Sequence, residues 1–180
     1  MSHQGLAPSR WVQRWASLVA PGGSVLDVAC GPGRHLRWFA ERGFKGTGVD
    51  RDPDALASLQ GVCEGVLADI ENGPWPLPGR RFDAVVVTNY LWRPLFPVLL
   101  DSVADGGVLI YETFGLAQAS VGRPSKPDFL LRPGELLQAV AGLRVIAYED
   151  GFLDSPERFV QRIAAVRERS SGALPARYRL

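Results

Sequence analysis

The segment 25–34 combines an acidic residue, two glycines and a predicted helix start. Asp27 lies within a short apolar run, Gly31 and Gly33 follow it closely, and a helical pattern begins at Arg34. Glycine lets the backbone approach a ligand, and the first turn of a helix presents unpaired N–H groups that favour an anion. This spacing predicts a ligand-binding turn between a buried strand and a helix. The alternative is a tight turn that binds nothing.

Two further acids end predicted strands. Asp50 lies 17 residues after Gly33, close to the spacing at which an acid binds the ribose hydroxyls of a nucleotide. Asp50 would otherwise cap the next helix, but Asp52 followed by a proline already fits that role. Asp69 follows the third apolar segment, with the apolar Ile70 beside it. The alternative for Asp69 is a loop residue without a ligand.

The elements that would position these residues alternate along the chain. Short apolar segments predict strands at 24–30, 46–50, 62–68, 82–88, 108–113, 143–149 and 159–167. Helical spacing, caps and stops predict helices at 9–19, 34–42, 52–60, 94–104 and 132–141. Alternation of this kind predicts an α/β, Rossmann-like, doubly wound domain with a mostly parallel sheet. Ligands bind such sheets outside the carboxyl ends of the strands. The glycine turn, Asp50 and Asp69 all fall at such ends.

The motif from Asp27 to Gly33 resembles motif I of the class I S-adenosylmethionine (SAM) dependent methyltransferases, with Ala29 in place of the first glycine. The third glycine of a dinucleotide fingerprint is missing. The stretch 74–87 is also similar to bacterial members, including those near the tellurite-resistance methyltransferases. The resemblance implies a seven-stranded sheet whose last strand is antiparallel, and SAM as cofactor. It implies these cofactor-binding residues: Asp27, Ala29, Cys30, Gly31, Pro32, Gly33, Asp50, Arg51, Asp69, Ile70 and Asn89.

The resemblance also indicates where an acceptor would lie, but it identifies no catalytic residue. A sulfonium methyl group is already activated, so positioning alone can carry the transfer, and a base is needed only for a protonated nucleophile. The candidates for the acceptor pocket are Tyr90, Trp92, Tyr111, Glu112 and Trp11. We expect His35 to be a surface or capping residue. The irregular segment 114–130, with Arg123 and Lys126, is either a lid over the acceptor or an ordered loop.

Three functions compete with methyl transfer to a small molecule, which we favour. An RNA methyltransferase would use the arginines near the C-terminus: Arg158, Arg162, Arg167, Arg169, Arg177 and Arg179. The alternative for them is a solvated strand edge and tail. A non-catalytic SAM-binding or partner-activating module would carry the same motifs. A nicotinamide dehydrogenase is disfavoured by the missing glycine and by Asp69.

Composition and length set the frame for these interpretations. The chain has 180 residues, a formal net charge of +1 and 46% hydrophobic residues. We therefore expect a single domain over 1–180, with a flexible tail at 170–180. No apolar run is long enough to span a membrane, and we expect a cytoplasmic protein. The two cysteines and two histidines predict neither a metal site nor a disulfide. The oligomeric state stays open.

Overall fold

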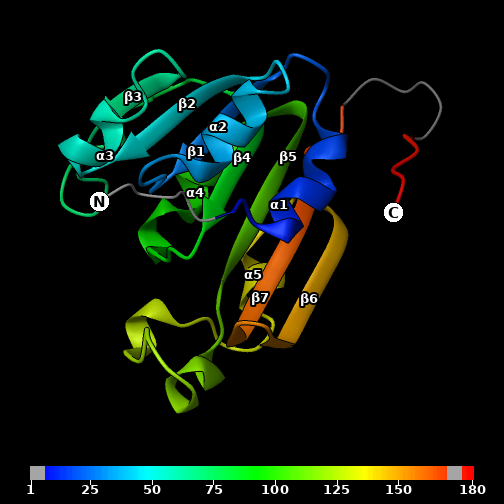
Figure 1. Cartoon of the computed structure of the whole chain (residues 1–180). Helices are drawn as coiled ribbons and strands as arrows, with labels where there is room; N and C mark the ends of the chain where they lie inside the picture. The colour runs from blue at the N-terminus through cyan, green and yellow to red at the C-terminus, as the bar shows by residue number, and fades with distance from the viewer. Residues whose placement is uncertain (1–6, 170–175) are drawn as a thin grey trace.

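A computed structural model describes residues 7–169 and 176–180 and shows a seven-stranded sheet in the order β3-β2-β1-β4-β5-β7-β6 (Figure 1). The strands are β1 (Ser24–Val28), β2 (Lys45–Asp50), β3 (Glu64–Leu67), β4 (Phe82–Thr88), β5 (Val103–Phe114), β6 (Arg144–Asp154) and β7 (Glu157–Val166). The α-helices are α1 (Arg10–Trp15), α2 (Arg34–Ala40), α3 (Pro53–Ala57), α4 (Phe96–Asp101) and α5 (Glu135–Ala139). Short 3-10 helices are η1 (Ala16–Leu18), η2 (Arg93–Leu95), η3 (Leu116–Ser120) and η4 (Pro127–Phe129).

The sheet is parallel from β3 to β5 and becomes antiparallel at β7. β1 lies between β2 and β4 and pairs parallel with both, and β4 pairs parallel with β5. β7 enters between β5 and β6 and runs antiparallel to both. The carboxyl ends of β1, β2 and β4 therefore meet at one edge. The predicted doubly wound sheet with an antiparallel last strand is confirmed.

Alternate side chains of the strands pack into two cores, one on each face of the sheet. Val25 of β1 and Val86 of β4 face a core formed with Trp11 of α1 and Phe39 of α2. On the other face, the strand residues pack against α4 and α5, with Leu99 and Leu136 fully covered. Burial of both faces explains why the central strands are almost continuously apolar, as parallel strands require.

Several element bounds differ from the sequence prediction. The helix predicted to reach residue 104 ends at Asp101, because Val103 is buried and already pairs with Phe82 of β4. The turn predicted at 150–156 is shorter, since β6 continues to Asp154 through its pairing with β7. The predicted tail falls partly on residues 170–175, which lie outside the described residues. Irregular segment 114–130 contains η3 and η4 and lies beyond the carboxyl end of β5 (Figure 1).

Candidate functional site

The glycine turn after β1 has a backbone that most residues avoid. Ala29, Gly31 and Gly33 all have positive φ, at 54°, 52° and 72°. Gly33 also packs against Leu59, since a Cβ there would lie 2.3 Å from Leu59 Cδ2. A Cβ on Gly31 would meet nothing within 4 Å, so the space beside this residue is open. The turn therefore combines a tightly packed glycine with an open one, as a backbone that receives a ligand requires.

Asp50 connects the glycine turn to the end of β2. Its Oδ2 accepts a hydrogen bond from the Gly31 N–H at 2.7 Å, and its Oδ1 accepts one from the Asp52 N–H at 3.0 Å. Asp52 caps α3 through the Asp54 and Ala55 N–H groups, as predicted. A carboxylate has about four lone-pair sites, so Asp50 retains acceptor capacity for the hydroxyls of a ribose. The same side chain thus holds the turn and lines the cavity beside it.

A cavity of about 310 Å³ lies at the carboxyl ends of β1, β2 and β3, and its volume is at the lower end of the range for small-molecule sites. It is lined by Ala29, Asp50, Arg51, Ala68, Asp69, Ile70, Glu71, Tyr90 and Phe129. Five of the predicted cofactor-binding residues therefore share one cavity. The turn residues Cys30 and Pro32 do not line it: the Cys30 side chain packs against Leu36 and Leu59.

Asp69 forms hydrogen bonds within its own turn and also lines the cavity. Its carboxylate accepts hydrogen bonds from the Glu71 and Asn72 N–H groups and from the Asn72 side chain, at 2.9 to 3.1 Å. The bond from the Asn72 side chain, with the two backbone bonds, lowers the pKa of Asp69. These bonds are the ones expected from the alternative, in which Asp69 is a loop residue, and one lone-pair site is left for a ligand. The neighbouring Ile70 is buried and offers an apolar wall.

Asp27 and His35 form a buried pair beneath the turn. The Asp27 Oδ2 and His35 Nδ1 atoms are 3.2 Å apart, and the Ser9 N–H donates to His35 Nε2 at 3.2 Å. Because Nε2 accepts this hydrogen bond, the ring carries its proton on Nδ1. The Nδ1–H group donates a hydrogen bond to Asp27. The expectation of a surface histidine was wrong: His35 is 1% exposed. Asp27, which was predicted to bind the cofactor, does not line the cavity.

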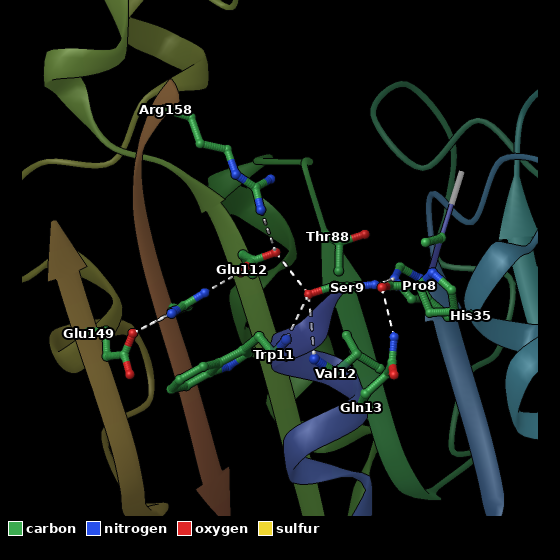
Figure 2. A network of polar contacts seen from close by, with 12 residues as sticks. Pro8, Ser9, Trp11, Val12, Gln13, His35, Thr88, Glu112, Glu149 and Arg158 are labelled. Atoms are coloured by element: carbon green, nitrogen blue, oxygen red, sulfur yellow. Dashed lines mark hydrogen bonds and ion pairs between the residues drawn. The ribbon is translucent and has the colours of Figure 1, made fainter. Parts of the chain in front are cut away.

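Ser9 extends this pair into a polar network that crosses the carboxyl ends of the strands (Figure 2). Its Oγ caps α1 and donates to Glu112 Oε1 at 2.9 Å. Glu112, at 1% exposure, forms ion pairs with Arg158 at 3.7 Å and Arg162 at 3.3 Å. Arg162 also pairs with Glu149. Glu112 was predicted to orient an acceptor, but its carboxylate is already committed to the N-terminal segment and to β7.

Arg34 places a second guanidinium at this edge. Its Nη2 donates to Thr88 Oγ1 at 3.4 Å, at the end of β4. Burial lowers the pKa of Arg34, while nearby Asp27 and Glu112 oppose that shift. Asn89 follows with a positive φ of 54°, and its N–H donates to the Glu112 carbonyl at 2.9 Å. The exposed Asn89 side chain is not among the residues that line the cavity.

The aromatic acceptor candidates divide into two groups. Tyr90 lines the cavity, and its hydroxyl donates to Glu71 at 3.2 Å; burial, followed by the charge of Glu71, raises the pKa of Tyr90. Trp92 packs partly against the core. Tyr111 and Trp11 are buried, and they donate to the carbonyls of Tyr90 and Ile163. The latter two are core residues in this structure, which corrects their placement in a pocket wall.

Three residues of this edge carry no signal of their own in the sequence pattern: Arg34, Arg93 and Phe129. Their positions depend on partners far along the chain, such as Glu135 for Arg93. Ser9 is different, because a serine before an amphipathic helix is an ordinary N-cap signal. Both cysteines are free thiols, and burial raises the pKa of Cys30. No cluster of potential metal ligands occurs among the described residues.

The strand order, the glycine turn and the acids at the ends of β2 and β3 define a Rossmann-like nucleotide-binding fold of the methyltransferase type. Residues 25–105 match the family model described as "Methyltransferase domain". Together with the sheet topology, this match shows that residues 25–105 are similar to a methyltransferase domain and that the chain has the fold of SAM-dependent methyltransferases. SAM is the cofactor of methyltransferases of this kind, and the cavity residues fit it, since Asp50 retains acceptor capacity and the turn beside it is open.

Three similar proteins illustrate the relationship. The structure of TehB from Haemophilus influenzae has a TM-score of 0.75 and 19% identity over 93% of this chain and 64% of that chain. The glycopeptide N-methyltransferase MtfA, complexed with sinefungin, has a TM-score of 0.63 and 18% identity over 91% of this chain and 94% of that one. Ribosomal RNA small subunit methyltransferase H from Gemmatimonas aurantiaca is 28% identical over 163 residues. That match covers 85% of this chain, which spans only 50% of the curated relative.

None of the helices within residues 7–169 and 176–180 combines the length and the apolar composition that a membrane span needs.

Proposed function

We propose that this chain transfers the methyl group of SAM to a small-molecule acceptor. The observation that carries the proposal is the cavity that Ala29 of the glycine turn lines together with Asp50, Asp69 and Ile70. We assign the ribose hydroxyls to Asp50 and the adenine edge to Asp69 and the Ile70 backbone. The sinefungin complex of MtfA supports a SAM-shaped ligand, because sinefungin is an analogue of SAM.

The protein's part in the reaction is positioning. When bound, SAM supplies a methyl group on a positively charged sulfur, which is already a good leaving group. The glycine turn and Asp50 orient the nucleoside, and the N-terminal segment held by Ser9 covers the strand ends beside it. Holding two reactants in line accounts for roughly 7–11 kcal/mol of a barrier. A general base is needed only if the nucleophilic atom of the acceptor arrives protonated, and we assign none.

The environment of the arginines supports a small acceptor over RNA. Arg158 and Arg162 are mostly buried and pair with Glu112, while Arg167 donates to the carbonyls of Val103 and Leu100. Three of the six arginines that suggested RNA binding are therefore already bound to partners of this chain. Arg144 further stacks over Tyr178 near the C-terminus. The formal net charge of +1 gives no general attraction to a polyanion.

Binding of S-adenosylhomocysteine (SAH) and SAM by titration calorimetry tests the cofactor, with NAD as the negative control. Asp50→Asn keeps the shape of the side chain but removes its charge, so we expect at least tenfold weaker SAH binding in a folded protein. Asp52→Asn is the matched control, because it changes an acid of the same turn that caps α3 and does not line the cavity. A folded wild-type protein that binds neither SAM nor SAH would contradict the proposal.

The acceptor class is tested by incubation with methyl-labelled SAM and either total RNA or a low-molecular-weight cell extract. We expect label in the small molecules and none in the RNA. RNA labelling that falls steeply with added salt would support the ribosomal RNA alternative, which the 28% identical relative favours. Cofactor binding without transfer to either fraction would support a non-catalytic SAM-binding module.

A further inference from the structure

Arg93, in η2 after β4, holds the end of the segment 114–130. Its Nη1 donates to the Asp128 carbonyl at 2.8 Å, and its Nη2 donates to the Leu130 carbonyl at 2.8 Å. The same guanidinium pairs with the Glu135 carboxylate, at 2.6 Å from Nε and 3.0 Å from Nη2. The Arg93 side chain is therefore hydrogen-bonded to the backbone carbonyls on both sides of Phe129.

Phe129 lies at the cofactor cavity. Its side chain lines the cavity together with Asp50, Asp69 and Tyr90, although it is 42% exposed. The next two residues, Leu130 and Leu131, are fully buried, and Leu131 forms a β-bridge with Gly115. The segment is thus anchored by Leu130 and Leu131, directly after the phenylalanine that lines the cavity. At 42% exposure, Phe129 leaves apolar surface open beside the cavity.

We propose that Phe129 forms a wall for the adenine ring of the bound cofactor, and that Arg93 is the residue that positions it. The inference rests on the proposed SAM site and assigns the segment 114–130 to that site, not to the acceptor. Aromatic rings stack on nucleobases whatever their hydrogen-bonding pattern. Ile70, buried on the side of β3, would cover the ring from another direction.

The chemistry of Arg93 explains why an arginine is needed. Its planar fork reaches two carbonyls and a carboxylate at once, which the compact ammonium of lysine cannot do. The Glu135 hydrogen bond raises the pKa of Arg93, so the guanidinium stays charged. Glu135 itself experiences burial, which acts to raise its pKa, but the Arg93 and Arg132 hydrogen bonds outweigh that effect and lower it. Both members of the Arg93–Glu135 ion pair are therefore charged at neutral pH.

The test measures SAH affinity and backbone hydrogen exchange of residues 116–131 in five proteins. These are the wild type, Phe129→Ala, Phe129→Trp, Arg93→Gln and the control Arg132→Gln. Arg132 also pairs with Glu135, at 3.6 Å, but its side chain is 74% exposed and it donates to neither carbonyl. We expect Phe129→Ala to weaken SAH binding about tenfold, which corresponds to ~1.4 kcal/mol. Arg93→Gln should weaken it similarly and speed exchange at 128–131, while Phe129→Trp retains affinity and Arg132→Gln stays within about twofold.

The outcomes separate this inference from the proposed function. If Phe129→Ala and Arg93→Gln both bind SAH as tightly as the wild type does, the assignment of Phe129 is overturned and the SAM site is left intact. A wild-type protein that binds no SAH would overturn the proposed function and this inference with it. Faster exchange at residues 128–131 in Arg93→Gln, accompanied by weaker binding in a protein that stays folded at the assay temperature, would support Arg93 as a positioning residue.

Discussion

Replacing Glu112 by glutamine removes the one carboxylate at the centre of the buried network. Glu112 is 1% exposed, and the side chains of its partners Arg158 and Arg162 are 22% and 17% exposed. Breaking a buried ion pair by removing one partner costs roughly 3–5 kcal/mol. Arg162 keeps Glu149, and both arginines retain some access to water, so we expect a loss of about 2–3 kcal/mol in the free energy of unfolding.

Urea denaturation followed by circular dichroism measures this loss, and a melting temperature lower by about 4–12 °C should accompany it. Glu149→Gln is the matched control. That carboxylate pairs with the same Arg162 at 2.7 Å, but its side chain is 45% exposed, so its loss should cost about 1 kcal/mol or less. Equal effects of the two substitutions, or a loss below about 1 kcal/mol for Glu112→Gln, would refute the argument that burial makes this network essential. Retained stability with lost activity would restore Glu112 to the acceptor site.

Three further substitutions test the glycine turn and the Arg93–Glu135 ion pair that holds the segment 114–130. Gly33→Ala places a Cβ 2.3 Å from Leu59 Cδ2 at a φ of +72°, so we expect a loss of about 2 kcal/mol by urea denaturation, whereas Gly31→Ala, with open space beside it, should lose only about 1 kcal/mol. Equal losses would show that the contact with Leu59 is unimportant. Glu135→Gln should destabilise by about 1–2 kcal/mol at pH 7. Because the folded protein lowers the Glu135 pKa, this difference should persist above the ordinary value of 4.5 and shrink as the pH falls below it; a difference independent of pH from 3 to 7 would argue against an ionised pair.

Much of the fold was predictable because its signals are local. The central strand β4 matches its predicted bounds, since an apolar run buried on both faces can only be a strand of this kind at that length. Asp52 capped α3 as expected, because a capping side chain bonds its own neighbours in sequence. Element ends were less predictable. Val103 shows the reason: the helix pattern continues through it, and only the partner Phe82 makes it a strand residue.

The residues at the cofactor cavity and the contacts from distant segments also differ in how far the sequence predicts them. The sequence by itself determined the glycine turn and the acids at the ends of β2 and β3, because spacing along the chain and strand alternation control each of them, whereas the antiparallel last strand followed from the family resemblance. Only the tertiary structure buried His35 between Asp27 and Ser9, joined Glu112 to Arg158, and brought Phe129 to the cavity through Arg93. Glu112 is separated from Ser9 by 103 residues and Arg93 from Leu130 by 37, so no local pattern connects them. Contacts of that range form when the sheet brings its strand ends to one edge.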